Sequence, residues 1–347
     1  MYPRETIDVL VTHEIDVIAL ERYLRAHIDG VNGPLTVRQF RGGQSNPTYY
    51  VDASGRRLVV RRKPPGQLLP SAHAIEREYA VMTALQGTGV PVPRTYLLCE
   101  DASILGTPFF VMDYIDGHPM TDAALPDCEP PERSAIYASM IDVLARLHTV
   151  DWRAIGLDNF GKPGNYIARQ VHRWTAQYRA SETGRIDSME HLITWLPEHI
   201  PADDSSTIVH GDYRPGNLLL DAAQPRVAAV IDWELSTIGH PLVDLGHYSL
   251  LFRTGPEDFG AFADRERPAG IPDERAQLER YCRITGRAAL PDWNFYVAFA
   301  MFRFAAICQG IMGRVLAGTA NDPDARKAGA RARPLADRAW ALINNDD

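Results

Sequence analysis

The 347-residue chain is 45% hydrophobic and 23% charged, an ordinary mixture for a globular protein that is long enough for two lobes sharing one cleft. Its 36 Lys and Arg residues against 44 Asp and Glu residues give a formal charge of −8, which argues against a general nucleic-acid binder because such proteins gain affinity by neutralising phosphates. Four cysteines without a C-x-x-C pair, no signal-peptide pattern at residues 1–5 and no apolar run of membrane-spanning length predict a cytoplasmic protein with reduced thiols, no structural metal and no membrane contact.

The first expected elements are a helix near residues 15–26 and, after a Gly- and Pro-containing break, two β-prone runs at 35–40 and 48–51. Between the two runs lies Phe40-Arg41-Gly42-Gly43-Gln44-Ser45-Asn46-Pro47, a strand-turn-strand whose backbone can approach phosphate oxygens. Candidate nucleotide-binding residues in it are Gly43, Ser45 and Asn46. The spacing is not G-x-G-x-x-G, and a plain hairpin turn explains the same residues equally well.

A cation and a carboxylate follow in the next two elements. The next strand ends its alternating apolar run at Arg61, where kinases carry the Lys of V-A-I-K. The helix at 74–85 then places Glu78 where it can hold that cation, so we interpret Arg61 as a phosphate contact and Glu78 as its partner. A guanidinium binds phosphate through two parallel hydrogen bonds, although its reach differs from that of an ammonium. Two solvated surface charges remain the alternative, and Arg62 or Lys63 could substitute for Arg61.

Residues 108–117 form an apolar strand that runs into a turn, at the point where a two-lobed kinase has its hinge. Backbone groups of Asp113 and Ile115 are the candidate adenine contacts, and Met112 flanks the predicted pocket. A buried edge strand without a ligand gives the same pattern, so only the order of the segments favours the hinge.

The rest of the chain is expected to be mainly helical. A Pro-rich connector at 126–132 precedes a helix at 133–148, and a pair of helices lies between 161 and 200. Further helices are expected near 274–285, 293–316 and 323–343. We therefore divide the chain into an N-terminal lobe, 1–114, for nucleotide binding and a C-terminal lobe, 115–347, with the catalytic loop and the acceptor-binding helices.

The strongest chemical pattern is His210-Gly211-Asp212-Tyr213-Arg214-Pro215-Gly216-Asn217, which is followed by an apolar run and by Asp232. Asp212 and Asn217 stand five positions apart, as in the kinase loop H-R-D-x-x-x-x-N. Phosphoryl transfer from ATP needs a carboxylate for the attacking hydroxyl and hard oxygen ligands for Mg²⁺. We therefore predict that Asp212 orients the acceptor and that Asn217 and Asp232 bind Mg²⁺. An ordinary hairpin is the alternative, and His210 is either a packed buttress of the loop or a proton carrier.

These motifs resemble the aminoglycoside phosphotransferase (choline kinase-like) superfamily over roughly residues 35 to 250. The resemblance rests on His210-Gly211-Asp212 with Asn217, on Ile231-Asp232-Trp233-Glu234 and on Ile75-Glu76-Arg77-Glu78. It implies a small-molecule kinase with ATP and Mg²⁺ as cofactors. It also implies a two-lobed, protein kinase-like α+β fold, with an antiparallel sheet plus helix in the small lobe and a mainly helical large lobe. Asp244 would brace the catalytic loop.

Three further segments, Gly42 to Tyr49, Arg61 to Gly66 and Leu69 to His73, resemble the kinase-like domain associated with acyl-CoA dehydrogenases. That resemblance implies phosphorylation of a hydroxyacyl-CoA, with a separate acyl-CoA dehydrogenase as the partner. Two alternatives stay open. One is a catalytically weak pseudokinase that serves as a nucleotide-binding scaffold, because Arg61 replaces the usual Lys; the other is a choline, homoserine or aminoglycoside kinase.

Overall fold

The computed structural model describes residues 3, 5–41, 46–66, 74–258, 260–263, 265–320 and 322–344. The chain forms two compact units: Met1–His118 with Ala228–Ser236, and Pro119–Val227 with Thr237–Asp347. The predicted α+β class is confirmed. The division into lobes at residues 114 and 115 stays a prediction. The structure adds one feature that the sequence did not indicate: the chain returns to the first unit, since residues 228–236 pack with it.

The first unit is built on one six-stranded sheet with the strand order β1-β2-β3-β4-β6-β5, in which all neighbours are antiparallel. Its strands are β1 Thr6–Ile7, β2 Leu35–Phe40, β3 Thr48–Ala53, β4 Arg56–Arg62, β5 Thr95–Cys99 and β6 Phe109–Asp113. The predicted β-runs at 35–40 and 48–51 are thus confirmed. Because strand side chains alternate between the two faces, successive residues of β4 serve different surroundings.

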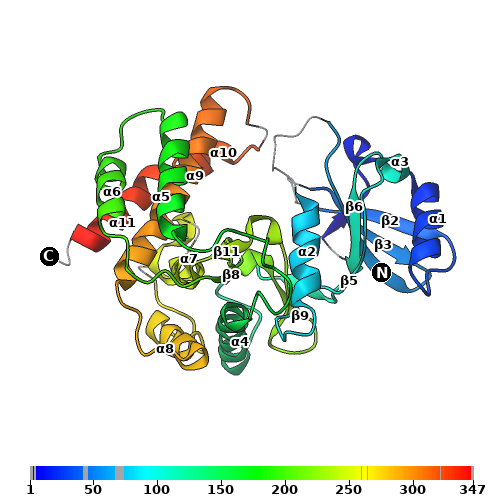
Figure 1. Cartoon of the computed structure of the whole chain (residues 1–347), viewed down its shortest axis with the longest axis horizontal. Helices are drawn as coiled ribbons and strands as arrows, with labels where there is room; N and C mark the ends of the chain where they lie inside the picture. The colour runs from blue at the N-terminus through cyan, green and yellow to red at the C-terminus, as the bar shows by residue number, and fades with distance from the viewer. Residues whose placement is uncertain are drawn as a thin grey trace. The chain divides into compact units, whose positions relative to one another are not determined.

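Helices lie on both faces of this sheet (Figure 1), namely α1 Val17–His27, α2 Ile75–Leu85 and α3 Ala102–Leu105. Leu20 and Leu24 of α1 pack against Leu58 and Val60 of β4 in one apolar core. The opposite face of β4 carries Arg61 toward α2. The short 3-10 helix η3, Trp233–Leu235, also packs on α2, and this contact brings the 228–236 segment into the first unit. Another 3-10 helix, η1, spans Val11–His13.

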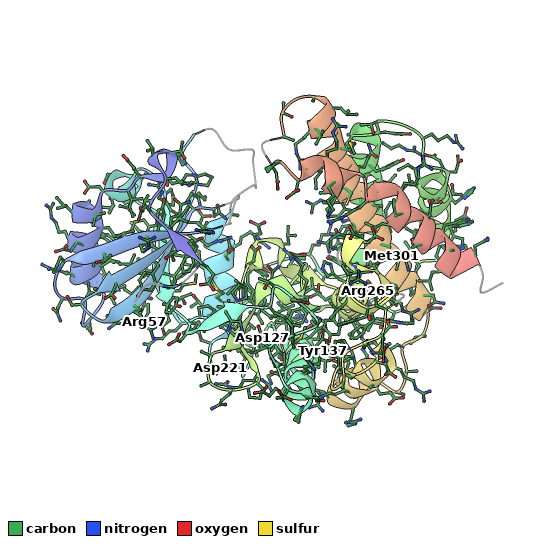
Figure 2. All side chains as sticks on the ribbon, turned by 180° about the vertical axis from the view of Figure 1, so that it is seen from behind. Arg57, Asp127, Tyr137, Asp221, Arg265 and Met301 are labelled. Atoms are coloured by element: carbon green, nitrogen blue, oxygen red, sulfur yellow. The ribbon has the colours of Figure 1, made fainter. Side chains whose placement is uncertain are left out.

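The second unit is mainly helical, as predicted. Its helices are α4 Pro130–Thr149, α5 Tyr166–Ala180, α6 Asp187–Glu198, α7 Pro241–Arg253, α8 Glu274–Thr285, α9 Trp293–Leu316, α10 Ala325–Gly329 and α11 Ala332–Asn344. Short elements complete the chain: β7 Gly117–Pro119, β8 Thr207–Val209, η2 Pro215–Asn217, β9 Leu218–Asp221, β10 Val227–Val230, β11 Thr237–Gly239 and η4 Pro256–Asp258. Helix α9 packs against α5, α7, α10 and α11. Met301 of α9 and Tyr137 of α4, both labelled in Figure 2, are buried in this unit.

Two boundaries differ from the sequence prediction for identifiable reasons. Helix α4 begins three residues earlier than expected, because prolines at its first positions need no hydrogen-bonded N–H and a capping box joins Glu129 to Glu132. The helix expected at 323–343 is divided into α10 and α11. Gly329 ends α10 where a Cβ would lie 2.9 Å from the backbone of Met312, so only glycine permits this close approach to α9.

Helix α9 also bears on the expected absence of a membrane-spanning run. By length and composition alone it could cross a membrane, with a mean hydropathy of 1.6 over its most apolar window. However, 78% of that window is buried inside the protein. A core helix of a globular domain passes the same test, so the helix is weak evidence for a membrane span.

Candidate active site

In the first unit, Arg61 and the buried Glu78 form an ion pair between β4 and α2. The Arg61 Nε lies 3.0 Å from Oε2 of Glu78, and Nη1 donates to Oγ1 of Thr48 at 3.2 Å. Glu78 is only 1% exposed. The alternative of two solvated surface charges is therefore wrong for this pair.

The neighbouring cations are held elsewhere. Arg62 points to the opposite face of the sheet, where its Nη1 donates to the backbone carbonyls of Glu14 and Leu105. Lys63 forms an ion pair with Glu76. Alternation along β4 explains why Arg62 faces away from Glu78, whereas Lys63, one residue past the end of β4, pairs with Glu76 instead.

Asp232 joins this cluster from the 228–236 segment. Its Oδ1 lies 3.4 Å from Nη2 of Arg61, and Oε2 of Glu234 lies 4.0 Å from the same nitrogen. Asp232 has the left-handed backbone conformation, with φ of 67° and ψ of 63°. Such a conformation is uncommon for a residue with a Cβ, although Asp tolerates it better than most, and it concentrates at functional sites.

The cluster carries more negative than positive charge. Burial raises the pKa of Glu78 to about 7; the Arg61 charge opposes this rise, whereas Asp232 and Glu234 add to it. One guanidinium therefore faces three carboxyl groups. The cluster has the charge of a site that favours an added cation.

Of the three candidate residues in the predicted phosphate-binding loop, Asn46 is the one that the structure describes. It is fully buried, and its Nδ2 donates to Oε1 of Glu78 at 3.1 Å. Its Oδ1 has no hydrogen-bond partner within the described part of the chain. Gly43 and Ser45 lie outside the described residues.

The predicted adenine contacts lie on or after β6. Met112 stands opposite Val59 of β4, and Val59 stands opposite Tyr50, so these side chains share the sheet face of Arg61. The Asp113 N–H, however, donates to the carbonyl of Arg94 at 2.8 Å, so this amide is already engaged within the unit. Ile115 is half-buried.

In the second unit, the loop 210–217 is held by its own polar side chains. The Asn217 Nδ2 donates to the backbone carbonyl of Asp212 at 2.9 Å and to its Oδ2 at 2.7 Å. The Arg214 Nε donates to the same carboxylate oxygen at 3.0 Å. Since Nδ2 of Asn217 is used in this way, its Oδ1 is the atom available to a metal ion.

Asp244 braces the loop from α7, as the resemblance implied. Its carboxylate accepts the N–H groups of His210 at 2.5 Å and of Gly211 at 2.9 Å. Gly211 has a φ of 82°, where a side chain is strained. His210 is fully buried, and its Nδ1 accepts the Asp212 N–H at 3.2 Å. The geometry favours the buttress over the proton carrier for His210.

Two further side chains support Asp212, and the sequence analysis missed both. The His247 Nε2 of α7 lies 3.3 Å from Oδ1 of Asp212, and the Arg303 Nη2 of α9 donates to the Gly211 carbonyl at 2.5 Å. Both side chains are buried. Their signals in the sequence were slight: His247 follows Asp244 by three residues, which places both on one helix face, and Arg303 is a charge inside an apolar run.

These neighbours set the charge of Asp212. Burial alone would raise the pKa of Asp212, but the hydrogen bond from His247 and the positive charge of Arg214 hold that pKa below its ordinary value. Burial lowers the pKa of His247 despite the Asp212 charge, so His247 is neutral at pH 7 and donates a hydrogen bond through Nε2. Asp212 is therefore an ionised acceptor in a fixed orientation.

Comparison with known proteins places these two clusters in context. Residues 36–286 match the family described as Phosphotransferase enzyme family. The chain is 47% identical over 346 residues to acyl-CoA dehydrogenase family member 10 of Mus musculus and 42% identical over 348 residues to acyl-CoA dehydrogenase family member 11 of Rattus norvegicus. Both alignments cover 98% of this chain but only 32% and 44% of the two relatives. The chain thus spans less than half the length of these curated relatives.

Solved structures show the same fold. A crystal structure from Ralstonia eutropha, provisionally described as an aminoglycoside phosphotransferase, is 48% identical with a TM-score of 0.88, and the likeness covers 96% of this chain and 99% of that chain. A thermostable mutant of an aminoglycoside phosphotransferase, in ternary complex with ADP and hygromycin B, is 16% identical with a TM-score of 0.61, over 93% of this chain and 98% of the other. The predicted kinase-like fold is confirmed. The roles of the individual site residues stay predictions.

Proposed function

The chain belongs to the phosphotransferase enzyme family, and on that premise we propose that it transfers the γ-phosphoryl group of ATP to a hydroxyl group of a small molecule. The observation that carries the proposal is the state of Asp212. It is an ionised carboxylate, oriented by Asn217 and His247 on a loop that Asp244 braces. Such a group is what the attacking hydroxyl requires.

In the proposed reaction, Asp212 accepts a hydrogen bond from the acceptor hydroxyl and thereby orients the hydroxyl oxygen toward the γ-phosphorus. A bond forms between that oxygen and the phosphorus, the bond from the phosphorus to the ADP oxygen breaks, and the hydroxyl proton passes to Asp212. A carboxylate with a low pKa is a weak base. Asp212 therefore contributes mainly by orientation, and accepts the proton late, when the new bond has made the hydroxyl acidic.

Arg61 is the proposed phosphate contact. Its guanidinium is always charged, and Glu78 and Thr48 fix its orientation. The face formed by Tyr50, Val59 and Met112 would take the adenine ring. The Oδ1 of Asn46 is a buried acceptor that a nucleotide or a bound water could satisfy.

Mg²⁺ fits the residues proposed to bind it. The Asn217 amide oxygen and the Asp232 carboxylate are the hard oxygen donors that Mg²⁺ prefers, and the cluster around Asp232 has an excess of negative charge. When bound, the ion would neutralise charge on the nucleotide phosphates. The left-handed conformation of Asp232 supports a functional role for that position.

For the acceptor we propose a hydroxyacyl-CoA, with a separate acyl-CoA dehydrogenase as the partner. The support is the identity of 40% and more to proteins that are named acyl-CoA dehydrogenase family members 10 and 11. Because this chain spans less than half of each, their activities are not transferred to it directly. A choline, homoserine or aminoglycoside acceptor remains the alternative, and the likeness to aminoglycoside phosphotransferases is its support.

The test measures ADP release from ATP in the presence of Mg²⁺, with hydroxyacyl-CoAs, free hydroxy acids, choline, homoserine and aminoglycosides as candidate acceptors. We expect release that depends on a hydroxyacyl-CoA and that is lost in Asp212→Asn. Asp127→Asn serves as the matched control, since Asp127 is an exposed carboxylate of the same unit (Figure 2). Full turnover by Asp212→Asn would contradict the proposed mechanism. ATP binding without turnover on any acceptor would favour the scaffold alternative that Arg61 in place of Lys keeps open.

A further inference from the structure

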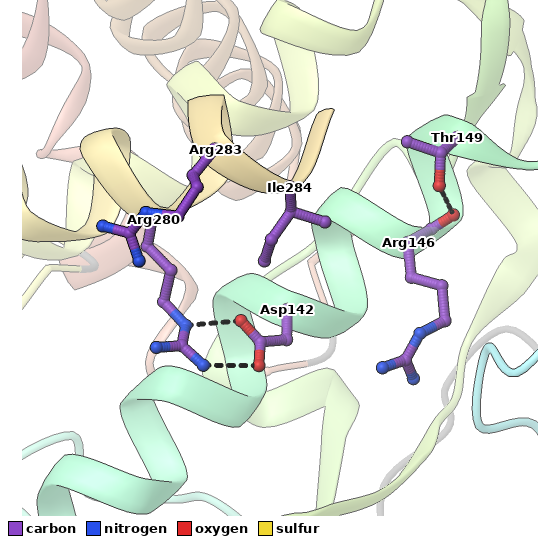
Figure 3. Close-up of a pocket in the computed structure, with 6 residues that line it drawn as sticks. All are labelled: Asp142, Arg146, Thr149, Arg280, Arg283 and Ile284. Atoms are coloured by element: carbon purple, nitrogen blue, oxygen red, sulfur yellow. Dashed lines mark hydrogen bonds and ion pairs between the residues drawn. The ribbon is translucent and has the colours of Figure 1, made fainter. Parts of the chain in front are cut away.

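A groove lies between α4 and α8 on the second unit, and none of the predicted site residues lines it. One part, shown in Figure 3, is a pocket of about 490 Å³ lined by Asp142, Arg146, Thr149, Arg280, Arg283 and Ile284. The adjoining part, of about 410 Å³, shares Arg280 and Arg283 and continues past Ala138 and Ser134. The two pockets adjoin at these arginines, and we refer to them together as the groove.

The residues of the α4 wall follow one helical stripe. Ser134, Ala138, Asp142 and Arg146 are spaced by four residues, so they line up along one face of α4. At 1.5 Å per residue, this stripe is about 18 Å long. The walls therefore suit an elongated occupant better than a compact ligand, which proteins usually enclose.

The groove is preformed, because two contacts fix the spacing of its helices. Arg280 of α8 donates to both carboxylate oxygens of Asp142 on α4, at 2.5 and 2.7 Å (Figure 3). On the inner side of the same helix pair, His148 Nδ1 lies 2.8 Å from the hydroxyl of Tyr281. A partner would not have to order these helices on binding, which lowers the cost of association.

The charge of the groove is positive, although the whole chain carries −8. Three arginines line the pocket of Figure 3 against one carboxylate, that of Asp142. Arg283 is exposed and has no carboxylate within 4.0 Å among the residues that the structure describes. Beside it, Ile284 is 41% exposed, which adds an apolar contact surface.

We propose that this groove binds an acidic segment of a partner protein. The arginines would pair with carboxylates on the segment, and Ile284 would contact an apolar side chain between them. The small residues Ser134 and Ala138 leave room for the backbone of the segment at the other end. Length, charge and an exposed apolar residue together favour a peptide over a free phosphate-bearing molecule.

The test is fluorescence anisotropy with a labelled helical peptide of about 15 residues, which spans the groove at 1.5 Å per residue. Its Glu residues stand at helical spacings of three and four on a background of Ala and one Leu. The control peptide has Gln in place of every Glu. The assay measures binding alone, so its outcome does not depend on the proposed phosphotransferase activity.

We expect the Glu peptide to bind the wild-type chain, and the double variant Arg146→Glu with Arg283→Glu to weaken that binding by about tenfold or more. Arg275→Glu is the matched control. It changes an 86% exposed arginine of the same helix that lies outside both pockets, and should alter the affinity by less than about twofold. Thermal unfolding checks that the exposed substitutions leave the fold intact.

Three outcomes would overturn the proposal. The Glu peptide could bind the double variant as tightly as the wild type, or the Gln peptide could bind equally well. Inorganic phosphate could show binding that is lost in the double variant while the Glu peptide shows none, which would identify a small-anion site.

Discussion

At the scale of single residues, Glu78 lowers the stability of the fold when it is ionised, yet it is the ionic partner of Arg61 in the proposed site. Burial, with the neighbouring carboxylates of Asp232 and Glu234, raises its pKa to about 7 from the ordinary 4.5, although the Arg61 charge lowers it. The folded protein therefore binds an additional proton between pH 4.5 and 7. Stability must fall as the pH rises through that window, because the folded state gives up this proton at a higher pH than the unfolded state does.

Glu78→Gln tests this conflict. We expect the variant to raise the free energy of unfolding at pH 8 by about 1 to 3 kcal/mol, since one pKa unit corresponds to about 1.4 kcal/mol. The KM for ATP should rise at the same time, because Arg61 loses its ionic partner. Urea unfolding at pH 8 and pH 4.5, with initial rates at varied ATP, measures both effects. Glu76→Gln on the same helix is the control, and a Glu78→Gln variant that is less stable at pH 8 would contradict the account.

His247 is a positioning residue for Asp212 in the proposed reaction. His247→Ala removes a hydrogen-bond donor to the carboxylate, so we expect kcat to fall by about 10- to 100-fold, while the KM for ATP stays within about twofold. His247→Gln should recover most of kcat, because the Gln amide can place an N–H near the position of the imidazole Nε2. Steady-state kinetics of both variants measures kcat and the KM for ATP separately. Equal losses in the Ala and Gln variants would show that His247 serves packing alone.

At the scale of the helices, α7 begins at an unusual capping residue. His240 is buried, and its Nδ1 accepts the Leu242 N–H at 3.3 Å. Burial lowers the pKa of His240 to about 4, although Asp203 acts in the opposite direction. The unfolded chain therefore binds more protons than the folded one between pH 4 and the ordinary value of 6.5. Protonation of this residue must destabilise the fold as the pH falls through that window.

His240→Asn separates capping from titration, because Asn is a preferred N-cap residue that does not titrate. We expect the wild-type chain to lose on the order of 3 kcal/mol more than the variant between pH 7 and pH 4, from about 1.4 kcal/mol per pKa unit. Urea unfolding at pH 7, 5.5 and 4 measures the difference. His199→Asn changes an exposed histidine and provides the baseline. A difference between His240→Asn and wild type that does not vary with pH would refute the titration account.

The helices also show what a sequence can reveal. The bounds of α8 and α9 match the predicted ranges. For α8 the signals in the chain are the capping Asp273 and the terminating Gly286. Asp212, Asn217 and Asp232 were predicted as site residues because their spacing matches a known chemical pattern. His247 and Arg303 were not, because each acts through a contact with a loop more than 30 residues away in the chain. Periodicity identifies which face of a helix is buried, but it does not identify the polar group that the face meets.

At the scale of the whole molecule, the first unit is discontinuous in sequence, which no local pattern indicates. The 228–236 segment returns to it through long-range contacts. The Val230 N–H donates to the Pro91 carbonyl at 2.9 Å, and Nη2 of Arg77 donates to the Ser236 carbonyl at 3.3 Å. Asp232 reaches Arg61 only because of this return. Asp232, a proposed metal ligand that sequence order assigned to the C-terminal lobe, thus belongs to the first unit by its contacts.

The discontinuity predicts that residues 1–118 are not a stable fragment. Trp233 is fully buried, and loss of a buried Trp side chain costs about 3 to 5 kcal/mol, a large share of the 5 to 15 kcal/mol that typically stabilises a domain. We expect a chain that joins 228–236 to residue 118 through a flexible linker of about 15 residues to unfold cooperatively in urea, at a higher midpoint than the 1–118 fragment. Circular dichroism follows both transitions. The linked chain with Trp233→Ala is the control, since it keeps the linker but should lose most of the gain. Equal midpoints for the 1–118 fragment and the linked chain would contradict this prediction, since they would mean that residues 228–236 do not stabilise the first unit.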